Sequence, residues 1–242
     1  PNNAVLVVAG DIDYAATRAM VERYFGGIPR GHPVVLPDIA EPRQTAEKVS
    51  RRVDKLAPRP GYAMGYHTPR RGTPEWYAMG LLDQILGQGD DSRLHRKLVK
   101  DTGITGDVNA GINFGLGNMY NYNGPMLWQV SFTHDPGRSP AEISAAIDAV
   151  MTEIASKPVS AEELARARTK ARAQFYGLIE TSTRFSLVDL LASYTLFDGD
   201  PAGVNRIEDG FAKVTPELLM ATAKEYLRPT NRTLALIEVA PK

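Results

Sequence analysis

The chain has 242 residues, of which 43% are hydrophobic and 23% are charged, a composition typical of a folded globular protein. Its 28 basic and 28 acidic residues cancel, so neither a nucleic-acid-binding surface nor an acidic tail is expected. The chain has no cysteine, which excludes disulfide bonds, thiolate metal ligands and cysteine catalysis. No apolar run reaches the roughly 20 residues that span a bilayer, so no membrane span is expected.

An apolar run near the N-terminus predicts a buried strand. Residues 4–9 are continuously apolar and rich in valine, a pattern typical of a strand that is buried on both faces. Asp13 then precedes a helix and is placed to cap its free amide groups. Four prolines between positions 29 and 42 exclude regular structure and predict an extended connection. The apolar face of the predicted helix comprises Thr17, Met20, Val21 and Tyr24.

Two strands and a helix start are predicted next. Residues 47–56 alternate charged with small or apolar side chains, as an exposed strand does, and residues 61–67 alternate large with small side chains. Thr73 and Pro74 then predict the start of a helix, since threonine caps the first amides and proline fits the first helical turn.

The rest of the predicted fold is organised around residues 81–99, which have the pattern of a helix, a break and a second helix. Gly87 and Gly89 end the first helix, and the Asp-Asp-Ser sequence of residues 90–92 supplies caps for the second. Two carboxylates at that helix start would repel an anion. The Gly-x-Gly spacing therefore indicates a tight corner between packed helices and not a phosphate site.

The second half of the chain combines a hairpin with helices. Residues 107–114 and 126–133 predict two strands joined by a loop rich in Gly and Asn. Ser-x-x-Glu capping boxes begin at Ser139 and Ser160. The later predicted elements are a long helix after residue 160, helices near 185–197 and 204–211, a helix from Thr215 to about Leu227, and a strand at 234–239.

This order of elements predicts an α+β fold, in which a mostly antiparallel sheet has helices packed on one face. The sequence contains no repeat, no low-complexity tract and no composition change that marks a domain boundary. Residues 1–242 are therefore expected to form one domain.

The four histidines are the first candidates for a metal site, but none has a second histidine at the spacing of a ligand pair. The carboxylate pairs Asp90/Asp91 and Glu162/Glu163 lie at predicted helix starts, where capping explains them. The residues alone predict no catalytic, cofactor-binding or metal-binding residue in this chain. The histidines are His32, His67, His95 and His134.

Five segments, in one order along the chain, carry a resemblance. Residues 2–13 (Asn-Asn-Ala-Val-Leu-Val-Val-Ala-Gly-Asp-Ile-Asp) and 21–29 look like the opening of a second domain. Residues 85–94, Ile-Leu-Gly-Gln-Gly-Asp-Asp-Ser-Arg-Leu, are similar to a Leu-Gly-Gly-Gly and Ser-Arg-Leu segment, and residues 159–164 and 214–217 fit later landmarks. Together they resemble the pitrilysin/insulinase family of zinc metallopeptidases.

The resemblance implies a metallohydrolase-like domain of the mitochondrial processing peptidase type, without an active site. Family members bind zinc through His-x-x-Glu-His on a helix and a downstream Glu, all in the preceding domain. This chain has no such motif and no initiator Met, so we expect a piece cut from a longer protein. Zinc is then expected in the parent protein, with its ligands outside this chain, and none is expected to be bound by this fragment.

The resemblance also indicates which half of the peptidase this domain belongs to. In the half opposite the zinc, the family carries an Arg and a Tyr that reach the substrate. Aligned on Leu98, those two positions are Val99 and Gly106, which have no side-chain hydrogen-bond donor. The chain therefore resembles the domain that follows the zinc domain in the zinc-bearing half.

The expected function is that of a substrate-enclosing, structural domain of a zinc-dependent endopeptidase, inactive by itself. The alternative is a scaffold domain of a catalytically inactive processing-peptidase-like subunit, and a further one is a binding module that uses residues 114–125. The expected partners are an upstream zinc-binding domain, a second peptidase half or subunit, and a peptide substrate. The lack of cysteine is compatible with the bacterial periplasm or cell envelope.

Overall fold

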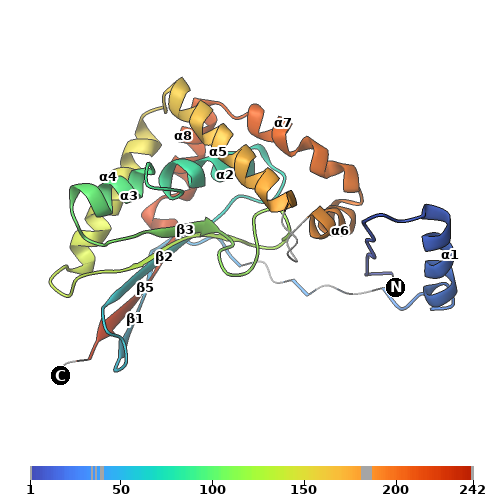
Figure 1. Cartoon of the computed structure of the whole chain (residues 1–242). Coiled ribbons are helices and arrows are strands. Elements are labelled where there is room, and N and C mark those ends of the chain that lie inside the picture. The colour runs from blue at the N-terminus through green and yellow to red at the C-terminus, as the bar shows by residue number, and fades with distance from the viewer. Residues whose placement is uncertain (1, 34, 36, 39–40, 181–186, 241–242) are drawn as a thin grey trace.

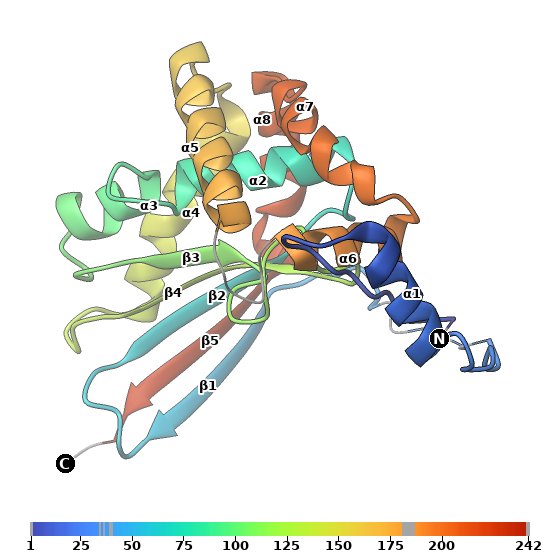
Figure 2. The same ribbon diagram turned by 45° about the vertical axis from the view of Figure 1, so that its right-hand side comes forward.

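A five-stranded mixed sheet underlies most of the helices (Figure 1, Figure 2). The computed structural model describes residues 2–33, 35, 37–38, 41–180 and 187–240. The strands are β1 (Lys48–Asp54), β2 (Gly61–His67), β3 (Asn109–Ile112), β4 (Leu127–Thr133) and β5 (Arg232–Val239). Their order is β1-β5-β2-β4-β3, with β1 parallel to β5 and all other neighbours antiparallel. The predicted α+β class and mostly antiparallel sheet are confirmed.

Alternation along the strands gives the sheet one face of mostly large, buried side chains. The other face has small side chains such as Ala63, Ser131 and Ala235, with the larger Gln129 and Ile237 beside them. The large side chains point toward the helices, which lie on one side of the sheet (Figure 1). Arg232 of β5 belongs to this side too, where its guanidinium binds Glu47 and Asp148. The buried row comprises Tyr62, Met64 and Tyr66 of β2, Trp128, Val130 and Phe132 of β4, and Leu234 and Leu236 of β5.

Seven helices of the described chain follow β2, and none has the length and apolar character needed to cross a membrane. The most buried is α2 (Pro74–Leu86), which packs against α5 and α8 and has ten of its thirteen residues buried. A π-helical segment, Arg96–Asp101, continues α3, and a 3-10 turn, Pro201–Arg206, precedes α7. The other helices are α3 (Arg93–His95), α4 (Pro140–Ser156), α5 (Ala161–Glu180), α6 (Leu187–Asp198), α7 (Ile207–Ala212) and α8 (Pro216–Tyr226).

The predicted helix starts are confirmed at the level of single hydrogen bonds. Thr73 Oγ1 accepts from the Trp76 amide, and Thr215 Oγ1 accepts from the Leu218 amide. Both capping boxes are half formed, because each serine caps its helix while the glutamate pairs with an arginine instead. The predicted helix at 185–197 is α6, and its first two residues lie outside the described residues.

The predicted strand at residues 4–9 is wrong. The segment is extended but forms no strand, and its Leu6 and Val8 side chains are 57% and 45% exposed. An apolar run becomes a strand only beside a neighbour that accepts its backbone hydrogen bonds, and no described strand takes that place. The helix that follows, α1 (Tyr14–Phe25), does form on its Asp13 cap, but none of its residues is buried. It lies apart from the sheet (Figure 1).

Candidate functional site

The histidines give no metal centre, since no described group of three His, Asp or Glu side chains is arranged to hold an ion. His134 is buried, with its Nδ1 2.9 Å from the Asp135 carbonyl oxygen. His67 Nε2 lies 3.8 Å from a Glu41 carboxylate oxygen at the end of β2. His32 is exposed in the connection that follows α1. These contacts position single side chains and assemble no set of ligands.

The central corner between α2 and α3 covers one edge of the sheet. Gln88 Nε2 donates a 2.8 Å hydrogen bond to the Ala110 carbonyl of β3, the edge strand. Gly87 lies so close to β3 that a Cβ there would stand 2.3 Å from the Ala110 Cβ. Gly89 follows with φ of +78°, a conformation that glycine adopts without strain. The predicted tight corner is therefore present, and it blocks strand addition at this point of the edge.

Fewer side chains cap the helix after the corner than predicted. Only Ser92 caps it, through Oγ, which accepts from the His95 amide. The prediction that Asp91 is a cap is wrong, because its carboxylate pairs with Lys170 Nζ at 2.7 Å. The prediction that Asp90 is a cap is also wrong, since no helix amide donates to its side chain; its oxygen lies 3.6 Å from His95 Nε2 instead.

A buried carboxylate that the sequence analysis overlooked, Asp83, lies behind the corner. Trp128 Nε1 donates to its Oδ1 at 2.7 Å, and Gln88 Nε2 donates to Oδ2 at 3.1 Å. Burial raises the pKa of Asp83 to about 6, because removal from water disfavours the charged form. The sequence feature that could have indicated Asp83 is its place between Leu82 and Ile85, in the middle of an apolar helix.

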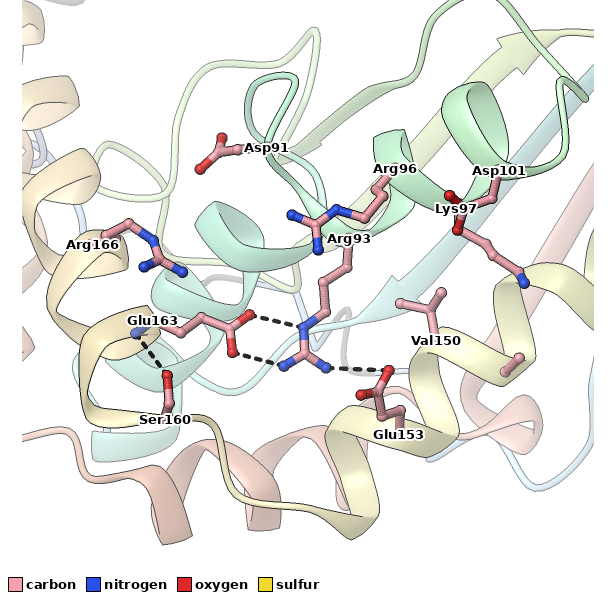
Figure 3. Close-up of a pocket in the computed structure, with 11 residues that line it drawn as sticks. Asp91, Arg93, Arg96, Lys97, Asp101, Val150, Glu153, Ser160, Glu163 and Arg166 are labelled. Carbon is pink, nitrogen blue, oxygen red and sulfur yellow. Dashed lines mark hydrogen bonds and ion pairs between the residues drawn. The ribbon is translucent and has the colours of Figure 1, made fainter.

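A polar cleft of about 450 Å³ lies between α3, α4 and α5 (Figure 3). At its centre the Arg93 guanidinium binds both oxygens of Glu163, at 2.9 and 2.8 Å, and lies 3.6 Å from Glu153. The hydrogen bond to Glu163 raises the pKa of Arg93. The four cations and four carboxylates that line the cleft balance in charge. Their ion pairs connect the helices, and no net charge is left to attract a charged ligand. The cations are Arg93, Arg96, Lys97 and Arg166, and the carboxylates are Asp91, Asp101, Glu153 and Glu163.

A wider hollow of about 570 Å³ lies on the face of the sheet away from the helices. Gly106 lies on its rim, and a Cβ at this position would meet no atom within 4 Å. Val99 is partly buried against the core instead. Neither position offers a hydrogen-bonding side chain. The polar groups of the hollow come from other lining residues, among them Arg59, Asp107 and Ser131. Small side chains form its floor: Gly61, Ala63, Ser131 and Ala235.

Sequence comparison identifies the family. Residues 1–171 match the model of the peptidase M16 inactive domain. A protein named as an uncharacterized zinc protease of Mycobacterium bovis is 27% identical over 114 residues, and a Mycobacterium tuberculosis protein of the same description has the same identity. The match covers 47% of this chain and 26% of each relative, so the chain spans only part of the length of these proteins.

Solved structures share the fold. A protease from Helicobacter pylori gives a TM-score of 0.77 at 18% identity, covering 95% of this chain and 53% of that chain. The inactive peptidase domain of a zinc protease from Bordetella parapertussis gives 0.61 at 24% identity, covering 73% and 91%. The periplasmic protease PqqL from Escherichia coli gives 0.68 at 16% identity, covering 96% and 25%. The predicted resemblance is confirmed, and the chain belongs to the peptidase M16 inactive domain family, the non-catalytic domains of pitrilysin/insulinase-type zinc proteases.

Proposed function

We propose that this chain is a substrate-enclosing, structural domain of a zinc-dependent endopeptidase, of the type found in mitochondrial processing peptidase. Residues 1–242 then act as one C-terminal-type domain beside a zinc-binding domain that lies outside them. A second peptidase half or subunit would close the enclosure around a peptide substrate. Family membership supports the non-catalytic role.

The open face of the sheet is the observation that carries the enclosing role. One row across this face, in hydrogen-bonded register, consists of Ser50, Ala235, Ala63, Ser131 and Asn109. None of these side chains is large or charged, so an extended peptide backbone can approach the sheet closely. Over β2 and β4 the opposite face is buried beneath the helices, which leaves this one free to line an enclosure.

The zinc chemistry is assigned to the other domain. The described His, Asp and Glu side chains form no group of three that could hold an ion, which supports placing the metal outside this chain. In pitrilysin-type peptidases the metal with its glutamate activates a water molecule. This chain would contribute the wall against which the peptide lies, and no step of the chemistry.

A periplasmic location is part of the same proposal. The absence of cysteine is compatible with an oxidising compartment, and one protein of the same fold is a periplasmic protease. The lack of side-chain donors at Val99 and Gly106 favours the zinc-bearing half over the opposite half as the place of this domain.

The test replaces a small side chain on the open face. In a preparation that contains this chain and the zinc-binding domain, Ala63→Trp should raise the KM for a fluorogenic peptide at least tenfold, because the ring fills the hollow. Zinc content should stay unchanged. The matched control is Val49→Trp, at a 49%-exposed position of β1 on the helix side of the sheet. A KM that Ala63→Trp leaves unchanged would contradict the enclosing role.

A further inference from the structure

A small hollow lies between helices α5 and α7, in the layer of helices on one side of the sheet (Figure 1). Its volume is about 160 Å³, whereas one water molecule needs only roughly 10–15 Å³, so the hollow has room for a small organic group. Three buried apolar side chains wall it, Phe175, Ile207 and Phe211. It shares no lining residue with the hollow on the open face of the sheet.

Aromatic contacts hold two of these walls in place. The Phe175 ring lies edge-on to the Tyr120 ring, with the ring centroids 5.4 Å apart, and the Phe211 ring lies edge-on to the Tyr77 ring at the same distance. Because each wall ring is packed against a second ring, turning it into the hollow would break a favourable contact. We therefore expect the hollow to persist without a ligand.

Arg168 brings to this hollow a cation with unused hydrogen-bond donors. Its Nη2 donates to the carbonyl oxygens of Ala212 at 2.9 Å and Val214 at 2.6 Å, which fixes the end of α7. Its Nε is buried and has no acceptor within the described part of the chain. A buried donor without an acceptor is unfavourable, so the arrangement favours a ligand that supplies one.

The charge of Arg168 is not balanced by the other residues of the hollow. Arg172 Nε lies 3.4 Å from a carboxylate oxygen of Glu208, and this pair accounts for one cation and the carboxylate that line the hollow. Arg168 remains as a second cation, whose hydrogen bonds go to backbone carbonyls. An apolar hollow with one surplus cation is suited to an anion that carries an apolar group.

We propose that the hollow between α5 and α7 binds a carboxylate attached to a small aliphatic group, as in the apolar C-terminal residue of a peptide or in a short fatty acid. The aliphatic group lies against Phe175, Ile207 and Phe211, and the carboxylate accepts from the guanidinium of Arg168, whose planar donors match carboxylate geometry. An inorganic anion would leave the apolar walls uncovered. This site is independent of the enclosing role.

The experiment measures binding to the full 242-residue chain by calorimetry. The probes are N-acetylleucine, which imitates a peptide end, butyrate, which imitates a short fatty acid, and N-acetylleucinamide, which has no charge. We expect saturable binding of one or both acids, at least fivefold tighter than that of the amide. The tighter acid identifies the source of the ligand.

Two variants address the two halves of the site. Arg168→Gln should weaken binding of the preferred acid at least fivefold, because it removes the cation. Ala212→Leu should weaken it similarly by filling the hollow, and it leaves the guanidinium in place if Arg168→Gln loosens α7. The matched control is Arg166→Gln, on the same helix, where the arginine pairs with Glu162 away from the hollow; it should bind as the wild type does.

Three results would overturn the inference. One is the absence of saturable binding of both acids. Another is binding of N-acetylleucinamide as tight as that of the acids, which would show that Arg168 recognises no carboxylate. The third is unchanged binding of the preferred acid by both Arg168→Gln and Ala212→Leu, which would place any bound acid elsewhere on the chain.

Discussion

Helices α1 and α2 have similar lengths, 12 and 13 residues, and each begins at a side-chain cap. Ten residues of α2 are buried, and none of α1 is. Local sequence signals therefore explain why both helices form and where they begin, but not what each one packs against. Burial of α2 comes from the sheet and from α5 and α8, whereas α1 has an apolar face and no equivalent partner among the described residues. The comparison separates a helix that is buried in the core from one that is exposed on the described part of the chain.

The largest effect is expected beneath α2. Trp128 is fully buried on β4 and donates to Asp83. Trp128→Ala should lower the free energy of unfolding by about 3–5 kcal/mol, since it opens a cavity and removes the donor of a buried carboxylate. Urea denaturation measures the change. A loss below about 1 kcal/mol would show that the core is far more adaptable than its packing implies.

The second-largest effect is the dependence of the free energy of unfolding on pH. The pKa of Asp83 is about 6 in the folded protein and 3.8 without the fold, so the folded state binds more protons in between. Stability from this group is fully present below pH 3.8 and is lost as pH rises through 6, by up to about 3 kcal/mol. Denaturation at pH 4.5 and 7.5 should therefore show a loss in the wild type that Asp83→Asn reduces. Equal pH profiles for both proteins would contradict the raised pKa.

A smaller effect is expected at the polar cleft. Arg93 is 20% exposed and binds Glu163, which is 22% exposed. Arg93→Met should lower the free energy of unfolding by about 1–2 kcal/mol, a value between those of exposed and fully buried ion pairs. Arg18→Met breaks a helical ion pair of α1 whose two side chains are 66% and 65% exposed, and it should leave the urea midpoint unchanged. Equal losses of stability for Arg93→Met and Arg18→Met would contradict the contrast between the two regions.

The smallest effect is expected on α1 itself. Tyr24→Ala removes a large ring that is 67% exposed, so the free energy of unfolding should change by no more than about 0.5 kcal/mol. Thermal melting of the chain alone checks this. A clear destabilisation would mean that α1 is part of the core, contrary to the exposure of its ring.

The sequence predicts local structure well wherever the cause is local. Caps at Thr73 and Thr215, the glycine corner at Gly87 and the alternation of β2 all depend on neighbouring residues, and all are confirmed. The fold class follows from the order of these elements. Strand order and the parallel pairing of β1 with β5 depend on contacts between distant segments, which periodicity does not contain.

The errors have the same origin. Residues 4–9 have a strand pattern, but a strand also needs a neighbour, which no local pattern records. Glu163 fits a capping box, yet Arg93 of a distant helix binds its carboxylate. Glu142 is an exception, because the competing Arg138 lies only four residues away. Asp83 was overlooked because its partner Trp128 lies on a distant strand.

The most direct test of the account compares the chain alone with the chain joined to the zinc-binding domain that we propose as its partner. Zinc content is measured by atomic emission, and cleavage of a quenched fluorogenic peptide is followed with and without a chelator. We expect the chain alone to hold no stoichiometric zinc and to cleave nothing, and the joined protein to hold zinc and to show chelator-sensitive cleavage. A joined protein that does neither would favour the inactive scaffold. Zinc binding and chelator-sensitive cleavage by the chain alone would contradict the account.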